Sequence, residues 1–488
     1  MLADEQEAET GPEENSLGKG IMSMQYRKSN IFGIRVVLAL VIILAMASFA
    51  LVGCGDDEVA TDETEGTTVE DTSAGTESTD GASAEAPENV PDEPLKIGLL
   101  VARSGVTAPV GEAAHRAVEW WAERVNADGG ILGRQVELLV EEESNPQDTV
   151  DRMRKLVLED EVSAVLGLIS TGVSLATAPI AEELETPLLM WDGTTQDGVE
   201  ETMPDPAYTF RSTDNETEAI AAAVLTAKYF PDTKRIVGIA NDYSYGHDTW
   251  NTYQAVLSKY MPDVEFVDAL FPELGATEFA SHITAIQQSG ADLLFNSFWS
   301  GDAPVFMKQA AAVNLFDDMN AVFTTAGGVH TSLEQDFVPE GMLLGYNTFY
   351  FDMPEKSDLL EEFLADYQEA YGDYPMYEAN NAYFTAVAYK AAVEAAYEEA
   401  GEWPSNEQVA EALVGIEVES LSGMMHYDDS KRMQGDFFQG ITVHSEDYSF
   451  ATIDPVEQLS TTDIMKPTAD TDLLQWIDES FPKEGLVE

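Results

Sequence analysis

From residue 95 onward, short apolar runs alternate with longer stretches in which apolar side chains recur every three or four positions. The run 95–101 is mostly apolar, which is typical of a buried strand. The stretch 111–126 that follows places Val118, Trp121 and Val125 on one face of a helix. This alternation indicates βαβ units, in which helices connect the strands of a mainly parallel sheet.

The alternation runs in two series of similar layout, which predict two doubly wound α/β lobes without a close sequence repeat. The first series ends near Arg211, and a later helix is expected at 380–400. The first series is expected to contain strands 95–101, 135–141, 162–168 and 187–190 and helices 111–126, 147–159 and 172–184. The second series is expected to contain helices 216–229, 246–260, 277–289 and 303–313 and strands 235–240, 264–270, 292–295, 320–325 and 341–348.

The composition is that of a folded and strongly acidic protein. A chain of 488 residues exceeds what one hydrophobic core usually organises, and 44% hydrophobic residues are enough to build such cores. Ninety Asp and Glu residues outnumber 24 Lys and Arg residues, which gives a formal net charge of −66. Because this charge repels phosphate backbones, we expect no nucleic-acid partner. One hypothesis is that the dense carboxylates reflect a saline habitat.

The N-terminal region has the layout of an export signal. The basic residues Arg27, Lys28 and Arg35 precede an apolar run at 36–53, which ends before Cys54. A retained membrane-spanning anchor is the alternative, since the run is just long enough to cross a bilayer. The tetrapeptide Leu-Val-Gly-Cys at its end resembles the lipobox of bacterial lipoproteins, which favours cleavage before a lipidated Cys54.

We therefore interpret residues 1–53 as a signal peptide, with Met22 or Met24 as alternative starts, and the remaining chain as extracytoplasmic and anchored to the cell membrane. Residues 54–94 are rich in Thr, Ser, Gly, Asp and Glu and contain few large apolar side chains. Such a segment cannot bury enough apolar surface to fold, so we expect a lipidated, acidic, disordered linker.

Ligands of doubly wound sheets gather at the carboxyl ends of the strands, so the residues after each expected strand are candidates for a binding site. Ser170 and Thr171 begin a helix, where backbone N–H groups attract an anionic group; simple helix capping is the alternative. Tyr243, Tyr245 and Trp299 lie in loops after strands, where large rings favour ligand stacking. Aromatic residues at helical spacing are expected in the core instead, namely Trp120, Trp121, Tyr367 and Tyr371.

A set of short motifs between residues 95 and 455 carries a family resemblance. The most specific is the run Asn-Ala-Asp-Gly-Gly-Ile-Leu-Gly at 126–133. Weaker motifs are Lys96-Ile97-Gly98, Ser104-Gly105 with Gly111, Ser170-Thr171 before a helix, Asp242-Tyr243-Ser244-Tyr245-Gly246 and Phe337-Val338-Pro339-Glu340-Gly341. With these motifs the chain resembles the type I periplasmic binding proteins, the substrate-binding lipoproteins of ABC importers for branched-chain amino acids, amides and urea.

The resemblance implies a two-lobed clamp whose chain crosses between the lobes three times, so that three segments form the hinge. By that topology, the first lobe comprises 95–212 and 352–425, and the second lobe comprises 213–351 and 426–455. Residues 456–488 then form a C-terminal extension.

The resemblance also implies which residues hold the ligand. Ser170 and Thr194 match positions that bind the polar head of the ligand in the first lobe. Tyr245 and Trp299 match positions that close over the ligand from the second lobe. The complete set of expected ligand contacts is Ser104, Ser170, Thr171, Trp191, Asp192, Thr194, Tyr243, Tyr245, Trp299, Gly327 and Tyr377.

Two departures from the family pattern concern charge. Amino-acid binders of this family place an acidic residue near Gly327 to hold the ammonium group, and 325–328 offers none. Asp192, in contrast, occupies a loop position that is usually small and neutral. One hypothesis is that the ammonium site has moved or that the ligand is not an α-amino acid. The alternative for Asp192 is that it only caps a turn beside Gly193.

These features predict a binding protein that captures a small polar metabolite, such as a branched-chain or other amino acid, an amide or a urea-like compound, and delivers it to the permease subunits of an ABC transporter. A ligand-sensing receptor of the same fold is the alternative. The sequence has no nucleophile-elbow, phosphate-loop or dinucleotide motif, so we expect no enzyme and no cofactor. Histidines without ligand spacing predict no metal site, and we expect a monomer.

Overall fold

The computed structural model describes residues 89–193, 202–203, 205–213, 215–467, 471–482 and 486. The expected signal peptide, Cys54 and most of the expected linker lie outside the described residues, as does Thr194. Residues from Ser83 onward belong to one compact unit. Within the described part of the chain, no helix combines the length and the apolar character that a bilayer crossing requires.

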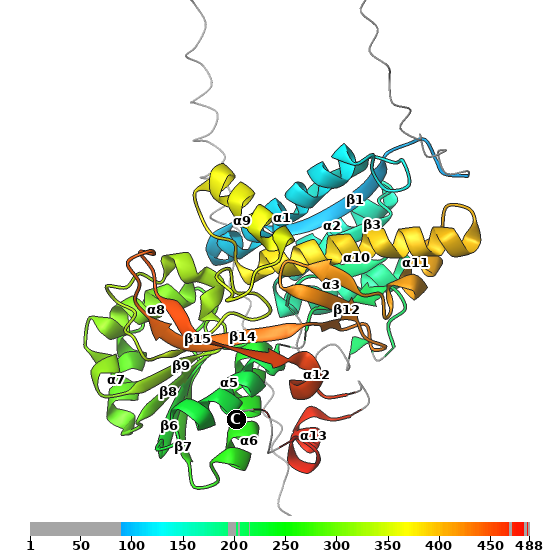
Figure 1. Ribbon diagram of the computed structural model, residues 1–488. Coiled ribbons are helices and arrows are strands. Elements are labelled where there is room, and N and C mark those ends of the chain that lie inside the picture. Colours follow the sequence, from blue (N-terminus) through cyan, green and yellow to red (C-terminus); the bar gives the residue numbers. More distant parts are fainter. Residues whose placement is uncertain are drawn as a thin grey trace, which may run out of the picture. The chain divides into compact units, whose positions relative to one another are not determined.

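The first lobe is built on a parallel five-stranded sheet with the order β2-β1-β3-β4-β5. Helices α1 and α10 cover one face, and α2 and α3 cover the other (Figure 1). The strands are β1 (Leu95–Ala102), β2 (Val136–Glu143), β3 (Ala164–Gly167), β4 (Leu188–Met190) and β5 (Thr209–Phe210), and the helices are α1 (Ala108–Ala127), α2 (Pro146–Leu158), α3 (Thr171–Glu183) and α10 (Tyr377–Ala400).

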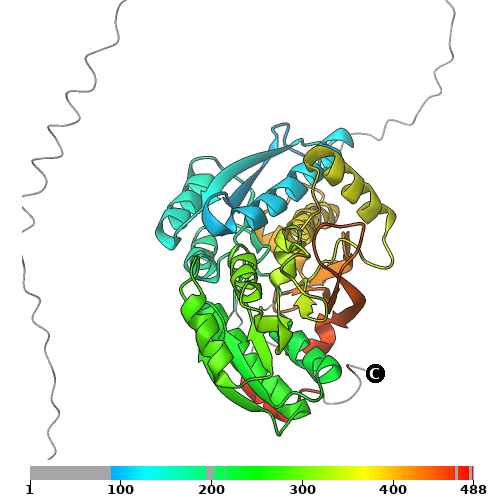
Figure 2. The same ribbon diagram turned by 90° about the vertical axis from the view of Figure 1, so that its left-hand side faces the viewer.

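The second lobe repeats this order in the parallel strands β7-β6-β8-β9-β10 and adds β14 and β15 antiparallel at one edge. Figure 2 shows the two lobes one above the other, with the second lobe in green. Its elements are α5 (Glu216–Tyr229), β6 (Arg235–Ile239), α6 (Ser244–Tyr260), β7 (Glu265–Leu270), α7 (Ala280–Ser289), β8 (Leu293–Asn296), α8 (Asp302–Ala311), β9 (Asn320–Phe323), β10 (Leu343–Gly345), β14 (Asp436–Val443) and β15 (Thr452–Ser460).

The chain passes between the two lobes three times, because α9 and α10 pack on α1 of the first lobe before β14 and β15 join the second sheet. The expected lobe boundaries at 425 and 455 fall inside β12 and β15, and the division into lobes by residue number stays a prediction. The remaining elements are α9 (Asp358–Tyr371), α11 (Asn406–Leu413), β11 (Val418–Ser420), β12 (Gly423–Tyr427), β13 (Met433–Gln434), α12 (Thr461–Ile464), α13 (Leu473–Glu479) and the 3-10 turns η1 (Gly105–Thr107), η2 (Leu315–Asp317) and η3 (Ala326–Ser332).

Side chains of each central strand alternate between two hydrophobic layers. In β1, Leu99 packs in the core under α1 and α10, whereas Leu100 packs in the core under α2 and α3. Strand β8 does the same, with Leu294 facing α7 and α8 and Phe295 facing α5 and α6. Both lobes therefore bury their sheets on both faces, which is why their strands read as continuous apolar runs.

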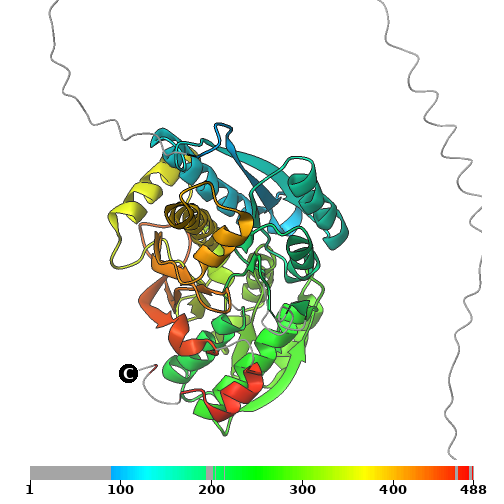
Figure 3. The ribbon, with the colours of Figure 1, turned by 90° about the vertical axis from the view of Figure 1, so that its right-hand side faces the viewer.

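The C-terminal segment covers the outer side of the second lobe. Leu473, Trp476 and Ile477 of α13 pack with Trp250 and Tyr253 of α6 in one hydrophobic cluster. Figure 3 shows α13, in red, lying along the green helices of this lobe. The predicted C-terminal extension thus contains a helix that packs in the core of this lobe.

The predicted elements of both series are present within a few residues of their expected bounds. Two predicted core aromatics, Trp121 and Tyr367, are buried, but the prediction for Tyr371 is wrong. Tyr371 is 42% exposed. Its ring instead lies 4.0 Å from the Arg116 guanidinium, on the solvent side of α9.

Candidate functional site

A small cavity lies where the carboxyl ends of the two parallel sheets face each other. Its free volume of about 10 Å³ holds about one water molecule, far below the roughly 300 to 1,000 Å³ of open ligand pockets, so the two lobes are closed tightly on each other here. Every lining residue is buried except Tyr243, which is half-buried. The cavity is lined by Ile169, Thr171, Asp192, Gly193, Asn215, Glu218, Tyr243, Tyr245, Trp299, Thr325 and Tyr377.

The topology explains why these residues meet. The loops after β3 and β4 supply the lining from Ile169 to Gly193, and the loops after β6, β8 and β9 supply Tyr243, Trp299 and Thr325. In a sheet of this strand order, the helices that follow two adjacent central strands pack on opposite faces of the sheet. A crevice therefore opens between the loops that leave the carboxyl ends of those two strands. The same crevice occurs in both lobes, so a single cavity receives side chains from both.

Asp192 is held in a fixed orientation by three donors. Its Oδ2 accepts a hydrogen bond of 2.7 Å from the Tyr377 hydroxyl, and its Oδ1 accepts one of 2.7 Å from the backbone N–H of Gly193. Asn215 Nδ2 donates a longer hydrogen bond of 3.4 Å to the same Oδ1. Asp192 therefore caps the turn beside Gly193 and lines the cavity at the same time.

The turn after Asp192 requires glycine. Gly193 has a φ of +74°, and a Cβ atom at this position would lie 2.2 Å from the carbonyl oxygen of Ile169. An L side chain would both strain the backbone and collide with the neighbouring loop. The close approach of the two loops brings Asp192 next to the end of β3.

Glu218 supplies a second carboxyl group, from the first turn of α5. Tyr245 donates a hydrogen bond from its hydroxyl to Oε1, and Asn347 Nδ2 donates one of 3.3 Å to Oε2. Helix α5 is apolar on all sides and is buried along most of its length, so an acidic residue in its first turn cannot reach bulk water. Glu218 is 1% exposed.

Two further carboxyl groups lie beside residues of the lining. Glu143, at the end of β2, accepts hydrogen bonds of 2.8 and 2.9 Å from the backbone N–H groups of Ile169 and Ser170. Glu378 follows Tyr377 at the start of α10, and neither of its carboxyl oxygens has a hydrogen-bond partner among the described residues. Both residues are buried.

Burial is the main cause of the raised pKa values of these four carboxyl groups. Desolvation raises the pKa of Asp192 to about 6, against hydrogen bonds that favour its charged form. Desolvation likewise raises the pKa values of Glu143 and Glu218 to about 8, and the negative charge of Asp192 adds to both shifts. For Glu378, burial and the nearby Asp192 hold the pKa well above its usual range.

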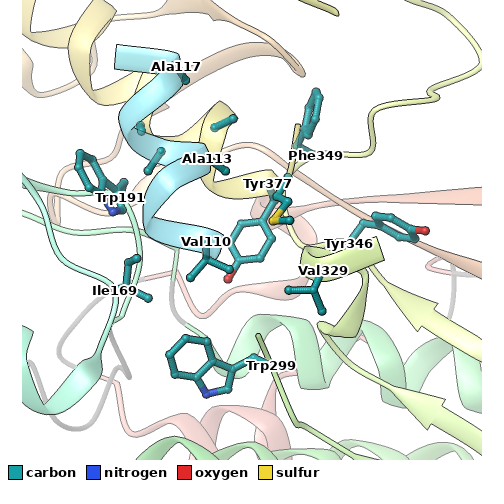
Figure 4. Packing of buried hydrophobic residues seen from close by; sticks show 14 of the residues in the cluster. Val110, Ala113, Ala117, Ile169, Trp191, Trp299, Val329, Tyr346, Phe349 and Tyr377 are labelled. Atoms are coloured by element: carbon teal, nitrogen blue, oxygen red, sulfur yellow. The ribbon is translucent and has the colours of Figure 1, made fainter. Parts of the chain in front are cut away.

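Aromatic rings form much of the remaining wall. The rings of Tyr243 and Tyr245 lie 5.8 Å apart between centroids, and Trp299 Nε1 donates a hydrogen bond of 2.8 Å to the Tyr243 hydroxyl. Figure 4 shows Trp299 and Tyr377 approaching each other from the two lobes. The site thus combines flat aromatic surface with carboxyl groups, which suits a ligand that has apolar surface and hydrogen-bond donors.

Two direct contacts hold the lobes together at the edge of the cavity. Ser300 of the second lobe donates a hydrogen bond from its hydroxyl to the backbone carbonyl of Val106 in the first. Gly328 of the second lobe packs against the Tyr377 ring so closely that a Cβ atom would lie 2.7 Å from Cε1. The structure is therefore that of a closed clamp around a small, buried space.

Six of the expected ligand contacts line the cavity, and four described ones do not. Thr171, Asp192, Tyr243, Tyr245, Trp299 and Tyr377 are in the lining, whereas Thr194 lies outside the described residues. Whether these residues contact a ligand stays a prediction. The four that lie outside the lining are Ser104, Ser170, Trp191 and Gly327.

Each of these four residues has another structural role. The Ser104 hydroxyl donates a hydrogen bond of 2.6 Å to Glu142, and Ser170 occupies the N-cap position of α3 with its backbone N–H on Glu143. Figure 4 shows the Trp191 ring beside α1, and the Trp191 carbonyl accepts a hydrogen bond of 2.9 Å from Asn381. Gly327 packs against the ring of Tyr346.

Sequence reasoning missed Glu218, Asn215 and Thr325 as lining residues. Thr325 lies in the same loop as Gly327, the loop in which the family resemblance implies an acidic residue and this chain has none. The signal for Glu218 was its place in the first turn of an otherwise apolar helix, since a buried helix forces its polar residues toward other polar groups. A carboxyl group thus reaches the cavity from α5, not from the loop beside Gly327.

Comparisons with known proteins agree with this architecture. Residues 94–440 match the family described as periplasmic binding protein. The chain is 22% identical over 291 residues to Leu/Ile/Val-binding protein homolog 7 of Brucella suis, which covers 58% of this chain and 72% of that protein. It is 24% identical over 235 residues to Leu/Ile/Val-binding protein BraC3 of Rhizobium johnstonii, which covers 48% of this chain and 61% of that protein.

Solved structures show the same fold. A solute-binding protein of an ABC transporter from Rhodopseudomonas palustris, in complex with 3,4-dihydroxybenzoic acid, superposes with a TM-score of 0.67 at 19% identity, covering 78% of this chain and all of that one. The branched-chain amino acid transporter substrate-binding protein LivJ from Streptococcus pneumoniae, in complex with isoleucine, superposes with a TM-score of 0.62 at 19% identity, covering 75% of this chain and 99% of that one.

Proposed function

Because this chain belongs to the periplasmic binding protein family, we propose that it is the extracytoplasmic substrate-binding component of an ABC transporter. In this role it captures a small metabolite in the cavity between its lobes and delivers the metabolite to permease subunits. We further propose that a lipid on Cys54 anchors the protein to the membrane, with residues 54–94 as the tether. The chain then acts by binding and by changing shape, without covalent chemistry.

One observation carries this proposal: side chains of both lobes line a single buried cavity at the carboxyl ends of two parallel sheets. A ligand in such a cavity gains contacts from both lobes only when the clamp is closed, so binding shifts the population toward closure. Closure in turn gives a permease a surface that differs between the loaded and empty protein. The three chain crossings between the lobes supply the hinge for this movement.

The substitution Gly328→Ala tests the clamp without altering a group that lines the cavity. The added methyl group would meet the Tyr377 ring of the opposite lobe, so the closed form is disfavoured. The φ of Gly328 is not in the left-handed region, so the open form accepts alanine. We expect calorimetry to show at least tenfold weaker binding of the ligand that the unsubstituted protein takes from a panel of amino acids, amides, amines and aromatic acids.

Small-angle scattering provides the second measurement. The unsubstituted protein should become more compact when the ligand is added, and the Gly328→Ala variant should need much more ligand to do so. Unchanged affinity and compaction in the variant would contradict the clamp, and an absence of binding to every compound class would contradict the proposed function. Mass spectrometry of protein extracted from membranes should find lipid on Cys54; an unmodified thiol would contradict the proposed anchor.

A further inference from the structure

The charge around the cavity is unbalanced. Asp192 and Glu218 line it, and Glu143 and Glu378 lie directly behind lining residues. No lysine or arginine lines the cavity in the described part of the chain. The stretch 194–201, which follows the Asp192 loop, contains no lysine or arginine in its sequence either. Four carboxyl groups therefore share one buried region without a cationic side chain in its lining.

Buried polar atoms without a hydrogen-bond partner occur in the lining and next to it. Glu378, which follows the lining residue Tyr377 and is itself outside the lining, is 1% exposed, and neither of its oxygens has a hydrogen-bond partner in the described structure. The hydroxyl oxygen of Thr325, which lines the cavity and is 3% exposed, has none either. Buried polar atoms without partners are costly, so the Thr325 hydroxyl favours a ligand that offers it a hydrogen-bond donor.

The same arrangement disfavours an anionic ligand group. In a site of this topology, an anion would lie near the N-terminus of α3, where backbone N–H groups attract it. Here a carboxyl group of the protein already lies beside that helix end, because Glu143 accepts hydrogen bonds from the N–H groups of Ile169 and Ser170, the two residues just before α3. A ligand carboxylate beside them would also face Asp192 and would gain little attraction in return.

The aromatic wall complements a cation. Four aromatic residues line the cavity, namely Tyr243, Tyr245, Trp299 and Tyr377. Ring faces carry partial negative charge and attract ammonium groups, and this attraction grows when both partners are shielded from water. The rings can hold the alkyl part of an amine while the carboxyl groups of Asp192 and Glu218 pair with its charge.

We propose that the ligand is a small organic cation that carries an ammonium group and no carboxylate. This inference rests on the proposed function, because it takes the cavity between the lobes as the ligand site. It narrows the proposed metabolite class to amines and quaternary ammonium compounds.

Binding of such a cation is coupled to proton release. Asp192 is surrounded by the Tyr377 hydroxyl, Asn215 and the carboxyl groups of Glu143, Glu218 and Glu378. Glu218 is surrounded by Tyr245, Asn347 and Asp192. None of these is cationic. Because the pKa values of Asp192 and Glu218 are raised to about 6 and about 8, part of this pair is protonated near neutrality, and a cation favours the charged forms.

Calorimetry with the purified full chain tests the inference after bound ligand has been removed by dialysis from urea. The probes are putrescine and choline as cations, leucine and isoleucine as zwitterions, 4-hydroxybenzoate as an anion and acetamide as a neutral amide. We expect binding of at least one cation, with an affinity that rises about tenfold from pH 5.5 to pH 7.5. The protons released should appear as a binding enthalpy that depends on the ionisation enthalpy of the buffer.

Variants separate charge from shape. Asp192→Asn and Glu218→Gln keep the size of each side chain and remove its charge, so each should weaken cation binding at least tenfold. Glu278→Gln, at an exposed position of the second lobe, is the matched control and should leave binding unchanged.

The outcomes distinguish the two proposals. Binding of a zwitterion, anion or neutral amide without binding of a cation would overturn the inference and leave the proposed function intact. Cation binding that neither Asp192→Asn nor Glu218→Gln weakens would also overturn the inference. Binding of no probe by the stripped protein would overturn both.

Discussion

The buried carboxyl of Glu218 should make the ligand-free protein less stable as the pH rises, and Glu218→Gln isolates this effect. Glutamine keeps the shape of the side chain and one acceptor oxygen for the Tyr245 hydroxyl, and it does not titrate. Burial raises the pKa of Glu218 from 4.5 to about 8 in the folded protein. Between these two pH values the unfolded chain loses this proton and the folded protein keeps it, so stability falls with rising pH.

The magnitude follows from the same pKa values. Each unit of pKa difference corresponds to about 1.4 kcal/mol, so Glu218 should cost about 2 to 3 kcal/mol of unfolding free energy between pH 5 and pH 7. Glu143 and Asp192 shift in the same direction, but both are present in the variant and largely cancel in the comparison. The variant should therefore lose less stability than the unsubstituted protein over this range.

Urea unfolding at pH 5 and pH 7, followed by tryptophan fluorescence after ligand removal, measures the difference. Glu278→Gln, which changes an exposed carboxyl of the same lobe, controls for loss of one surface charge. If the stability difference between the Glu218→Gln variant and the unsubstituted protein stays constant to within about 0.5 kcal/mol from pH 5 to pH 7, Glu218 is not held uncharged by burial, and the reasoning fails.

Three further predictions concern the fold. Trp476→Ala should lower the unfolding free energy by about 3 kcal/mol because Trp476 packs in the core of the second lobe, whereas Leu474→Ala on the exposed side of the same helix should change it by less than about 0.5 kcal/mol. Gly193→Ala should cost roughly 2 kcal/mol or more in urea unfolding and weaken ligand binding, because the added Cβ would collide with Ile169; wild-type stability in this variant would contradict the turn geometry. Raising sodium chloride from about 0.05 to 1 M should raise the thermal unfolding temperature, since salt screens repulsion among surface carboxylates of a chain with net charge −66; a flat response would reject this view of its acidity.

Local sequence pattern was sufficient for most of the parallel core of each lobe, and missed only the two-residue strand β5 among the parallel strands described. Helix 216–229 was predicted with the bounds that α5 has, because its apolar residues continue without interruption between polar turns. The antiparallel strands β14 and β15 were not predicted, since their place at the edge of the second sheet depends on partners such as β10, far away in the chain. Pairing over such distances leaves no signal in a short window of sequence.

The same distinction holds within the site. Asp192, Tyr243 and Trp299 were predicted because they follow strands, and the loops after β3, β4, β6, β8 and β9 lead to the cavity. Trp191 packs in the hydrophobic core and its neighbour Asp192 lines the cavity, because successive residues at a strand end point to opposite sides and the sequence does not state which of them faces the other lobe. Glu218 was missed because it approaches from a helix N-terminus after the chain has crossed between the lobes.

The position of Glu218 links the carboxyl groups of the cavity to the chain segments that connect the two lobes. Glu218 lies just after the first crossing, and its partner Asn347 lies after β10, where the second crossing begins. Asn215, in the first crossing itself, contacts Asp192 of the first lobe. The two carboxyl groups that line the cavity are therefore tied to the segments that must rotate when the lobes separate. A cation favours the charged forms of both groups and pairs with both only while the lobes are together, so charge compensation itself favours closure.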